Sequence, residues 1–144
     1  MMEKIKEFNE NVDIENKKVI LRSDFNVPIL KDVIQDKTRI DLSIPFIKSL
    51  LKRKAKLLLI SHLGRPKSDK DKNYSLKPVF EYLQKKIDNK IYFYSDKITN
   101  KTKEKISFLD NSEIIFFENI RLNDGEIKTM TTLHRIYPSL ETYI

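Results

Sequence analysis

Four short apolar runs, separated along the chain by segments of helical periodicity, most constrain how this chain folds. They cover residues 18–22, 56–60, 91–94 and 114–117, and their central residues are apolar without alternation. Strands that are apolar on both faces are typical of a parallel sheet covered by helices on its two sides. Alternation of strands and helices predicts the same architecture. We therefore expect an α/β fold in three layers around a parallel sheet.

Helical periodicity marks the segments between these runs. The apolar face of the first helix comprises Ile40, Ile44, Ile47, Leu50 and Leu51. The face of the second comprises Leu76, Val79, Phe80, Leu83 and Ile87. Such spacing predicts amphipathic helices, which Asp36 and Ser75 are placed to cap. Pro45 should bend the first helix or remove one backbone hydrogen bond, and residues 99–108 predict a short charged helix.

Polar loops follow the predicted strands. They are residues 23–28, 61–66 and 118–121, and Arg39 lies near the start of the first helix. Ligands of open α/β folds bind outside the carboxyl ends of the strands. Because these groups all fall at that end of the sheet, we expect them to form one site.

Three arginines give this site its predicted chemistry. Arg39, Arg65 and Arg121 each lie at a strand end or a helix start. The planar guanidinium grips carboxylate and phosphate oxygens through two parallel hydrogen bonds. Each arginine alone is more simply read as a solvated surface residue. Their shared position favours a site for a doubly anionic ligand.

The remaining candidates each have a structural alternative. Asp24 and Asn26 offer groups suited to a hydroxyl, although both are common turn residues before a proline such as Pro28. His62 can donate to a phosphate or carboxylate, but a lone histidine is often structural. Gly64 lets the backbone approach a ligand, or it merely completes a turn.

The net charge of +7 and the pI of about 9.4 raise nucleic-acid binding as an alternative. We disfavour it because the lysines are dispersed, with no compact basic block. No cysteine is present, which excludes disulfides, and two histidines make a histidine-rich metal site an unfavoured choice. No apolar run approaches the roughly 20 residues that cross a bilayer. We expect a cytoplasmic protein that binds neither nucleic acid nor membrane.

Long stretches of the sequence resemble one known family. They are V-I-L-R-S-D-F-N-V-P, D-K-T-R-I, L-L-I-S-H-L-G-R-P-K, Y-S-L-K-P-V and F-F-E-N-I-R-L-N-D-G-E. In this order, from Lys17 to about Lys128, the chain resembles the N-terminal part of phosphoglycerate kinase. The resemblance implies two Rossmann-like α/β lobes joined by a hinge. It implies phosphoryl transfer in glycolysis, between 1,3-bisphosphoglycerate with ADP and 3-phosphoglycerate with ATP.

The resemblance also implies a set of substrate-binding residues: Asp24, Phe25, Asn26, Arg39, His62, Leu63, Gly64, Arg65 and Arg121. Asp24 and Asn26 would contact the glycerate. His62, Arg65 and Arg121 would bind its phosphate end. Arg39 would lie nearest the transferred phosphoryl group, stabilise its charge and so act in catalysis.

Family members are well over twice as long as this chain, which stops at Ile144. We therefore expect residues 1–128 to form a partial N-terminal lobe that lacks the nucleotide lobe. Mg-ATP or Mg-ADP would bind on the missing lobe, so no nucleotide-binding or metal-ligating residue is assigned to this chain. Because lobe closure aligns the reactants, we expect no kinase activity from the chain alone. The alternative is a non-catalytic remnant that binds 3-phosphoglycerate; the family is usually monomeric.

Residues 129–144 depart from the family text. Read one base out of frame, codons permitted for this segment spell N-N-D-N-N-F-A-Q-N-L-S-K-L-G-D-I-Y, which fits the family pattern F-A-x-x-L-x-x-L-x-D-x-Y. We therefore interpret this segment as a non-family tail created by a frameshift near Lys128; the alternative is a divergent C-terminus with its own role. On the frameshift interpretation the tail should not pack. Its apolar residues could form only a weak stripe, broken by Pro138.

Overall fold

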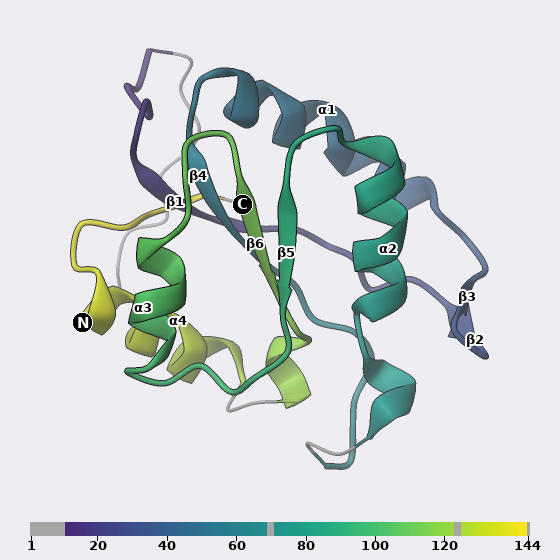
Figure 1. Ribbon diagram of the computed structural model, residues 1–144. Helices are drawn as coiled ribbons and strands as arrows, with labels where there is room; N and C mark the ends of the chain where they lie inside the picture. The colour runs from purple at the N-terminus through teal and green to yellow at the C-terminus, as the bar shows by residue number, and fades with distance from the viewer. Residues whose placement is uncertain (1–10, 69–70, 123–124, 144) are drawn as a thin grey trace.

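A five-stranded parallel sheet forms the centre of the computed structural model, which describes residues 11–68, 71–122 and 125–143 (Figure 1). In spatial order its strands are β5 (Ile91–Tyr94), β6 (Ile114–Phe117), β4 (Lys56–Ile60), β1 (Lys18–Arg22) and β7 (Glu141–Tyr143). The first four occupy the residues that the apolar runs predicted. The α/β fold with a parallel sheet is confirmed.

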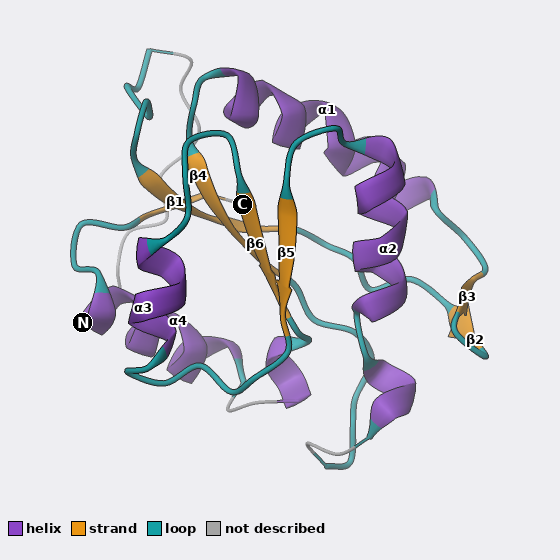
Figure 2. Ribbon diagram, viewed as in Figure 1, coloured by secondary structure: helices purple, strands orange, loops and turns teal. Residues whose placement is uncertain are grey.

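Helices cover both faces of this sheet (Figure 2). The helices α1 (Thr38–Lys52) and α2 (Lys77–Lys86) pack on one face, and α3 (Thr102–Ser107) and α4 (Glu126–Ile136) pack on the other. Alternate strand residues enter the two cores: Val19 and Leu21 face α1 and α2, whereas Ile20 faces α3 and α4. Apolar burial on both faces explains why the strands show no alternation in sequence.

Side chains outside the helices hold the starts of α1 and α2. The Asp36 carboxylate accepts a hydrogen bond from the Thr38 N–H at 2.9 Å. Hydrogen bonds from Thr38 lower the pKa of Asp36 below its usual value. Before α2, the Ser75 hydroxyl accepts from the Lys77 N–H at 3.1 Å. The helix α1 continues through Pro45, which leaves one backbone carbonyl without its usual donor.

A small antiparallel hairpin was not predicted. Its strands, β2 (Ile29–Leu30) and β3 (Val33–Ile34), pair across a two-residue turn. Both turn residues, Lys31 and Asp32, have positive φ angles of 50° and 63°. Such a turn matches the twist of a hairpin. Two short 3-10 segments, η1 (Lys72–Tyr74) and η2 (Ile120–Leu122), complete the described elements.

The expectation that residues 129–144 do not pack was wrong. The Leu133 side chain is fully buried on the sheet face that α3 also covers, and β7 pairs in parallel with β1. The physical reason is the spacing of apolar residues, since Met130, Leu133 and Tyr137 recur on one helical face. Pro138 ends α4 without preventing it, because the preceding residue simply becomes extended.

The crevice, by which we mean the region outside the carboxyl ends of β4 and β6, is defined by the sheet topology. The chain leaving β4 leads to α2 on one face, whereas the chain leaving β6 leads to α4 on the opposite face. Because β4 and β6 are neighbours, their loops diverge and open a topological switch point. In the described parts of the chain, no helix is long and apolar enough to span a membrane.

Candidate functional site

The loops that follow β1, β4 and β6 meet at the crevice. The Phe25 N–H donates to the Ser61 hydroxyl at 3.0 Å, which joins the first loop to the second. The Ile120 N–H donates to the Ser61 carbonyl at 3.2 Å, which joins the third. The structure therefore brings together loops that are distant in sequence, as the carboxyl-end argument predicted.

Arg39 contacts the loop after β1 from the first turn of α1. Its Nη1 donates to the Asn26 carbonyl at 3.0 Å and lies 3.3 Å from the Asp24 carboxylate. The Asp24 carboxylate also accepts from the Asn26 N–H at 3.1 Å. The Arg39–Asp24 pair is exposed and contributes at most about 1 kcal/mol to stability. Its main consequence is to hold the guanidinium at this loop.

Gly64 connects this arrangement to Arg121. The Gly64 N–H donates to the Asn26 side-chain oxygen at 3.0 Å, and the Gly64 carbonyl accepts from Arg121 Nη1 at 2.7 Å. Hydrogen bonds thus run continuously from Arg39 through Asn26 and Gly64 to Arg121. Arg39 and Arg121 each use one Nη atom in this series of hydrogen bonds, and each has further donors on its guanidinium.

Four further residues of the predicted set occupy different environments. Phe25 and Leu63 have side chains buried in the core, so only their backbone faces the loops. His62 is partly buried beside Leu63. Arg65 is exposed and forms no hydrogen bond or ion pair with any residue that the structure describes. Their roles in binding stay predictions.

Sequence reasoning missed the residues that hold the loops in place. The Glu118 carboxylate accepts from the Ser75 hydroxyl at 2.6 Å and from the Leu76 N–H at 2.7 Å. It accepts also from the Asn119 N–H at 2.8 Å, and Asn119 itself is fully buried. These residues stand within the loops already selected. Ser75 and Leu76, which Glu118 binds, lie more than 40 residues away in the chain, so no local signal identified these contacts.

Comparison with known proteins identifies the family of this chain. A family model described as phosphoglycerate kinase matches residues 9–144. The chain belongs to the phosphoglycerate kinase family. It is 40% identical over 130 residues to phosphoglycerate kinase from Buchnera aphidicola subsp. Schizaphis graminum, and 41% identical over 131 residues to that from a Wolbachia of Drosophila simulans. Phosphoglycerate kinases are transferases, and their family implies a glycolytic setting.

The chain spans about a third of the length of these relatives: 90% and 91% of it matches 32% and 33% of theirs. The structure of phosphoglycerate kinase from Coxiella burnetii shows the same relation, with a TM-score of 0.71 and 31% identity over 90% of this chain and 32% of that one. The chain is thus similar to one part of a phosphoglycerate kinase. The division at residue 128 stays a prediction.

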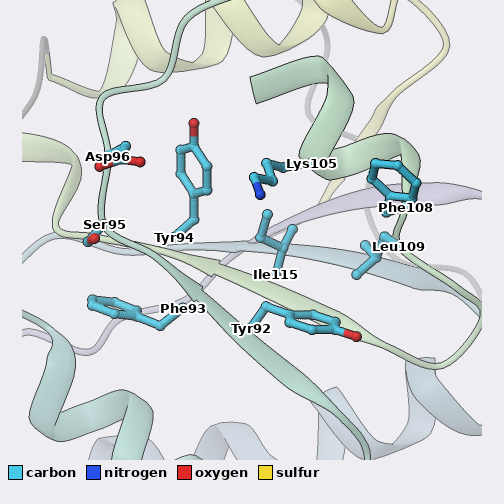
Figure 3. A pocket seen from close by; sticks show the side chains of 9 residues that line it. All are labelled: Tyr92, Phe93, Tyr94, Ser95, Asp96, Lys105, Phe108, Leu109 and Ile115. Carbon is cyan, nitrogen blue, oxygen red and sulfur yellow. The ribbon is translucent and has the colours of Figure 1, made fainter. Parts of the chain in front are cut away.

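A cavity of about 410 Å³ lies elsewhere, beside the edge strand β5 (Figure 3). Its lining comes from β5 and the residues after it, from α3 and the residues after it, and from β6. It comprises Tyr92, Phe93, Tyr94, Ser95, Asp96, Lys105, Phe108, Leu109 and Ile115. None of the predicted substrate-binding residues belongs to this lining. The cavity is therefore separate from the candidate site.

Replacing Gly64 with alanine should lower the free energy of unfolding by about 2–3 kcal/mol. Gly64 has a φ of +58°, and an added Cβ would lie 2.3 Å from Cε1 of the Tyr74 ring. In a Tyr74→Leu background the same replacement should cost only about 1 kcal/mol, because the steric part is removed and the backbone strain remains. Urea denaturation of the four proteins measures both values; equal costs in the two backgrounds would rule out the clash.

Proposed function

We propose that this chain binds the glycerate substrate of the phosphoglycerate kinase reaction, 3-phosphoglycerate or 1,3-bisphosphoglycerate, at the crevice between β4 and β6. The supporting observation is the hydrogen-bonded chain from Arg39 through Asn26 and Gly64 to Arg121. It holds two guanidinium groups, from α1 and η2, against the loops around one switch point, with the exposed Arg65 next to Gly64. This arrangement suits an anion with charges at both ends.

Each residue has a distinct role in this proposal. Asp24 and Asn26 bind the glycerate hydroxyl, and the phosphate end is bound by His62, Arg65 and Arg121. Arg39 lies at the end where phosphoryl transfer takes place and stabilises the charge that develops there. Because Arg39 contacts Asp24 and the Asn26 carbonyl through Nη1, its other guanidinium donors can bind substrate oxygen atoms.

We propose that nucleotide and magnesium, which the family uses in general, do not bind to these 144 residues. Within the described residues, no three His, Cys, Asp or Glu side chains gather as a metal site. We propose that the 144-residue chain binds substrate in the cytoplasm but transfers no phosphoryl group by itself. Turnover by the purified chain, free of host enzyme, would contradict this.

Calorimetric titration of the chain with 3-phosphoglycerate tests the binding proposal. We expect Arg39→Ala, Arg65→Ala and Arg121→Ala each to weaken binding at least about tenfold, the value of one charged hydrogen bond. Arg135→Ala is the matched control, since Arg135 is exposed and donates to Asn100 far from the crevice. Absence of binding by the unaltered chain, or equal losses in all four variants, would overturn the proposal.

The second part of the proposal is that a shifted reading frame produced residues 129–144, even though this segment packs on the sheet. Its support is the family-like text that the alternative frame permits after Lys128. Resequencing the coding DNA across and beyond this codon tests it. A downstream frame that is offset by one base and encodes kinase-like sequence is the expected result. Downstream DNA without kinase-like coding in any frame would overturn it.

A further inference from the structure

Asn119 uses all four hydrogen-bonding positions of its side-chain amide. The Oδ1 atom accepts from the backbone N–H groups of Leu63 and Arg121, both at 3.1 Å. The Nδ2 atom donates to the carbonyls of Leu63 at 2.7 Å and Tyr74 at 2.9 Å. A primary amide has two donors and two acceptor lone pairs. Together with complete burial, this leaves Asn119 no capacity to contact a ligand.

These bonds fix backbone on both sides of the crevice. Leu63 follows β4, Arg121 follows β6, and Tyr74 lies before α2 with its ring against Gly64. One side chain therefore sets the spacing of the two diverging loops. Residues that make several buried hydrogen bonds resist rotation, because each displaced group would be left unsatisfied.

The peptide plane between Leu63 and Gly64 transmits this restraint to the site. Its carbonyl is held by Asn119, and the N–H of the same peptide unit donates to the Asn26 side chain. Because a peptide unit is planar, fixing the carbonyl fixes the direction of that N–H. Asn26 in turn accepts from Arg39, and the Gly64 carbonyl accepts from Arg121.

We infer that Asn119 is a positioning residue for the anion-binding arginines: it sets the Leu63–Gly64 peptide and the Arg121 backbone, and through them the placement of Arg39 and Arg121. The inference rests on the proposed function. It concerns a residue that does not touch substrate and whose effect passes through Gly64.

The test compares Asn119→Asp with Thr102→Val in the full chain. Asn119→Asp keeps the shape but replaces two donors by an oxygen facing two carbonyls. Thr102 is equally buried and bonds to Thr99 and Tyr94 away from the crevice. We expect Asn119→Asp to weaken 3-phosphoglycerate binding at least tenfold, measured where both variants are folded, and Thr102→Val to change it less than twofold. In an Arg121→Ala background, Asn119→Asp should lose most of its effect.

Amide hydrogen exchange separates this inference from the proposed function. Asn119→Asp should speed exchange at the Leu63, Gly64 and Arg121 amides at least tenfold, with no comparable change at β1 amides, whether or not the chain binds 3-phosphoglycerate. If the unaltered chain does not bind, the proposed function fails and exchange alone decides the positioning role. If Asn119→Asp does not fold, slow exchange of the Asn119 side-chain amide protons in the unaltered chain is the expected result. The inference would be overturned by unchanged backbone exchange in Asn119→Asp. It would also be overturned by rapid exchange of the Asn119 side-chain amide protons, or by an effect of Asn119→Asp on affinity no larger than that of Thr102→Val.

Discussion

Replacing Leu133 with aspartate should lower the free energy of unfolding by at least about 4 kcal/mol, enough to unfold a marginally stable domain. Leu133 is fully buried between α4 and the sheet, in the same cluster as Ile20 and Leu58. The change removes apolar contacts and places a carboxylate among apolar side chains. Circular dichroism during thermal and urea denaturation measures the loss.

Ile127→Asp is the control for this result. Ile127 lies on the same helix, but its side chain is 85% exposed. The substitution also converts a branched aliphatic residue to aspartate, and we expect a change within about 0.5 kcal/mol. Small and equal effects at Leu133 and Ile127 would mean that the segment after Gly125 does not pack on the sheet.

Replacing Phe116 with alanine should lower the free energy of unfolding by about 3–5 kcal/mol. Phe116 is fully buried in β6 and has edge contacts with Phe25 at 5.8 Å and Phe93 at 5.9 Å between ring centroids. Phe93 stacks on Phe80 of α2 at 5.2 Å. Phe116 therefore links the loop after β1 to β5 and α2, and its removal leaves a cavity at the centre of this row.

Phe108→Ala is the matched control, because the Phe108 side chain is 77% exposed after α3. We expect it to cost less than about 1 kcal/mol. Since Phe25 stands between Asp24 and Asn26, Phe116→Ala should also weaken 3-phosphoglycerate binding, whereas Phe108→Ala should not. Equal losses of stability from the two replacements would contradict the packing described for β6.

Four strands and three helices were predictable. Burial leaves a pattern in the sequence of the strands and of the first two helices, and α3 was expected as a short charged helix over residues 99–108. Residues such as Val19 and Ile20 enter opposite cores, which requires continuous apolar runs. The hairpin was not predicted, because each of its strands has only two residues and so leaves no periodic pattern in the sequence. Its turn uses Lys31 and Asp32 where glycine or asparagine usually marks positive φ. The surrounding chain imposes this turn geometry, so the residue preferences of the turn itself do not predict it.

The convergence of the loops at the candidate site was predictable, because the carboxyl ends of parallel strands share one edge. The hydrogen bonds that connect these loops were not predictable. Glu118 and Asn119 act through Ser75, Leu63 and Tyr74, and these pairings exist only once the strands have taken their order. The packing of α4 was missed for a different reason: the segment was judged by its family text, although burial depends only on the spacing of its apolar residues.

The place of β1 between β4 and β7 has a consequence for how the chain folds. The register pairs Val19, near the start of the described chain, with Glu141, near its end. During synthesis on the ribosome, the edge of β1 that pairs with β7 therefore stays unpaired until β7 has emerged. Pairings between such remote segments form slowly and leave an open strand edge in the interval. Dependence on chaperones during translation, rather than weak native packing, is then the expected vulnerability of this sheet.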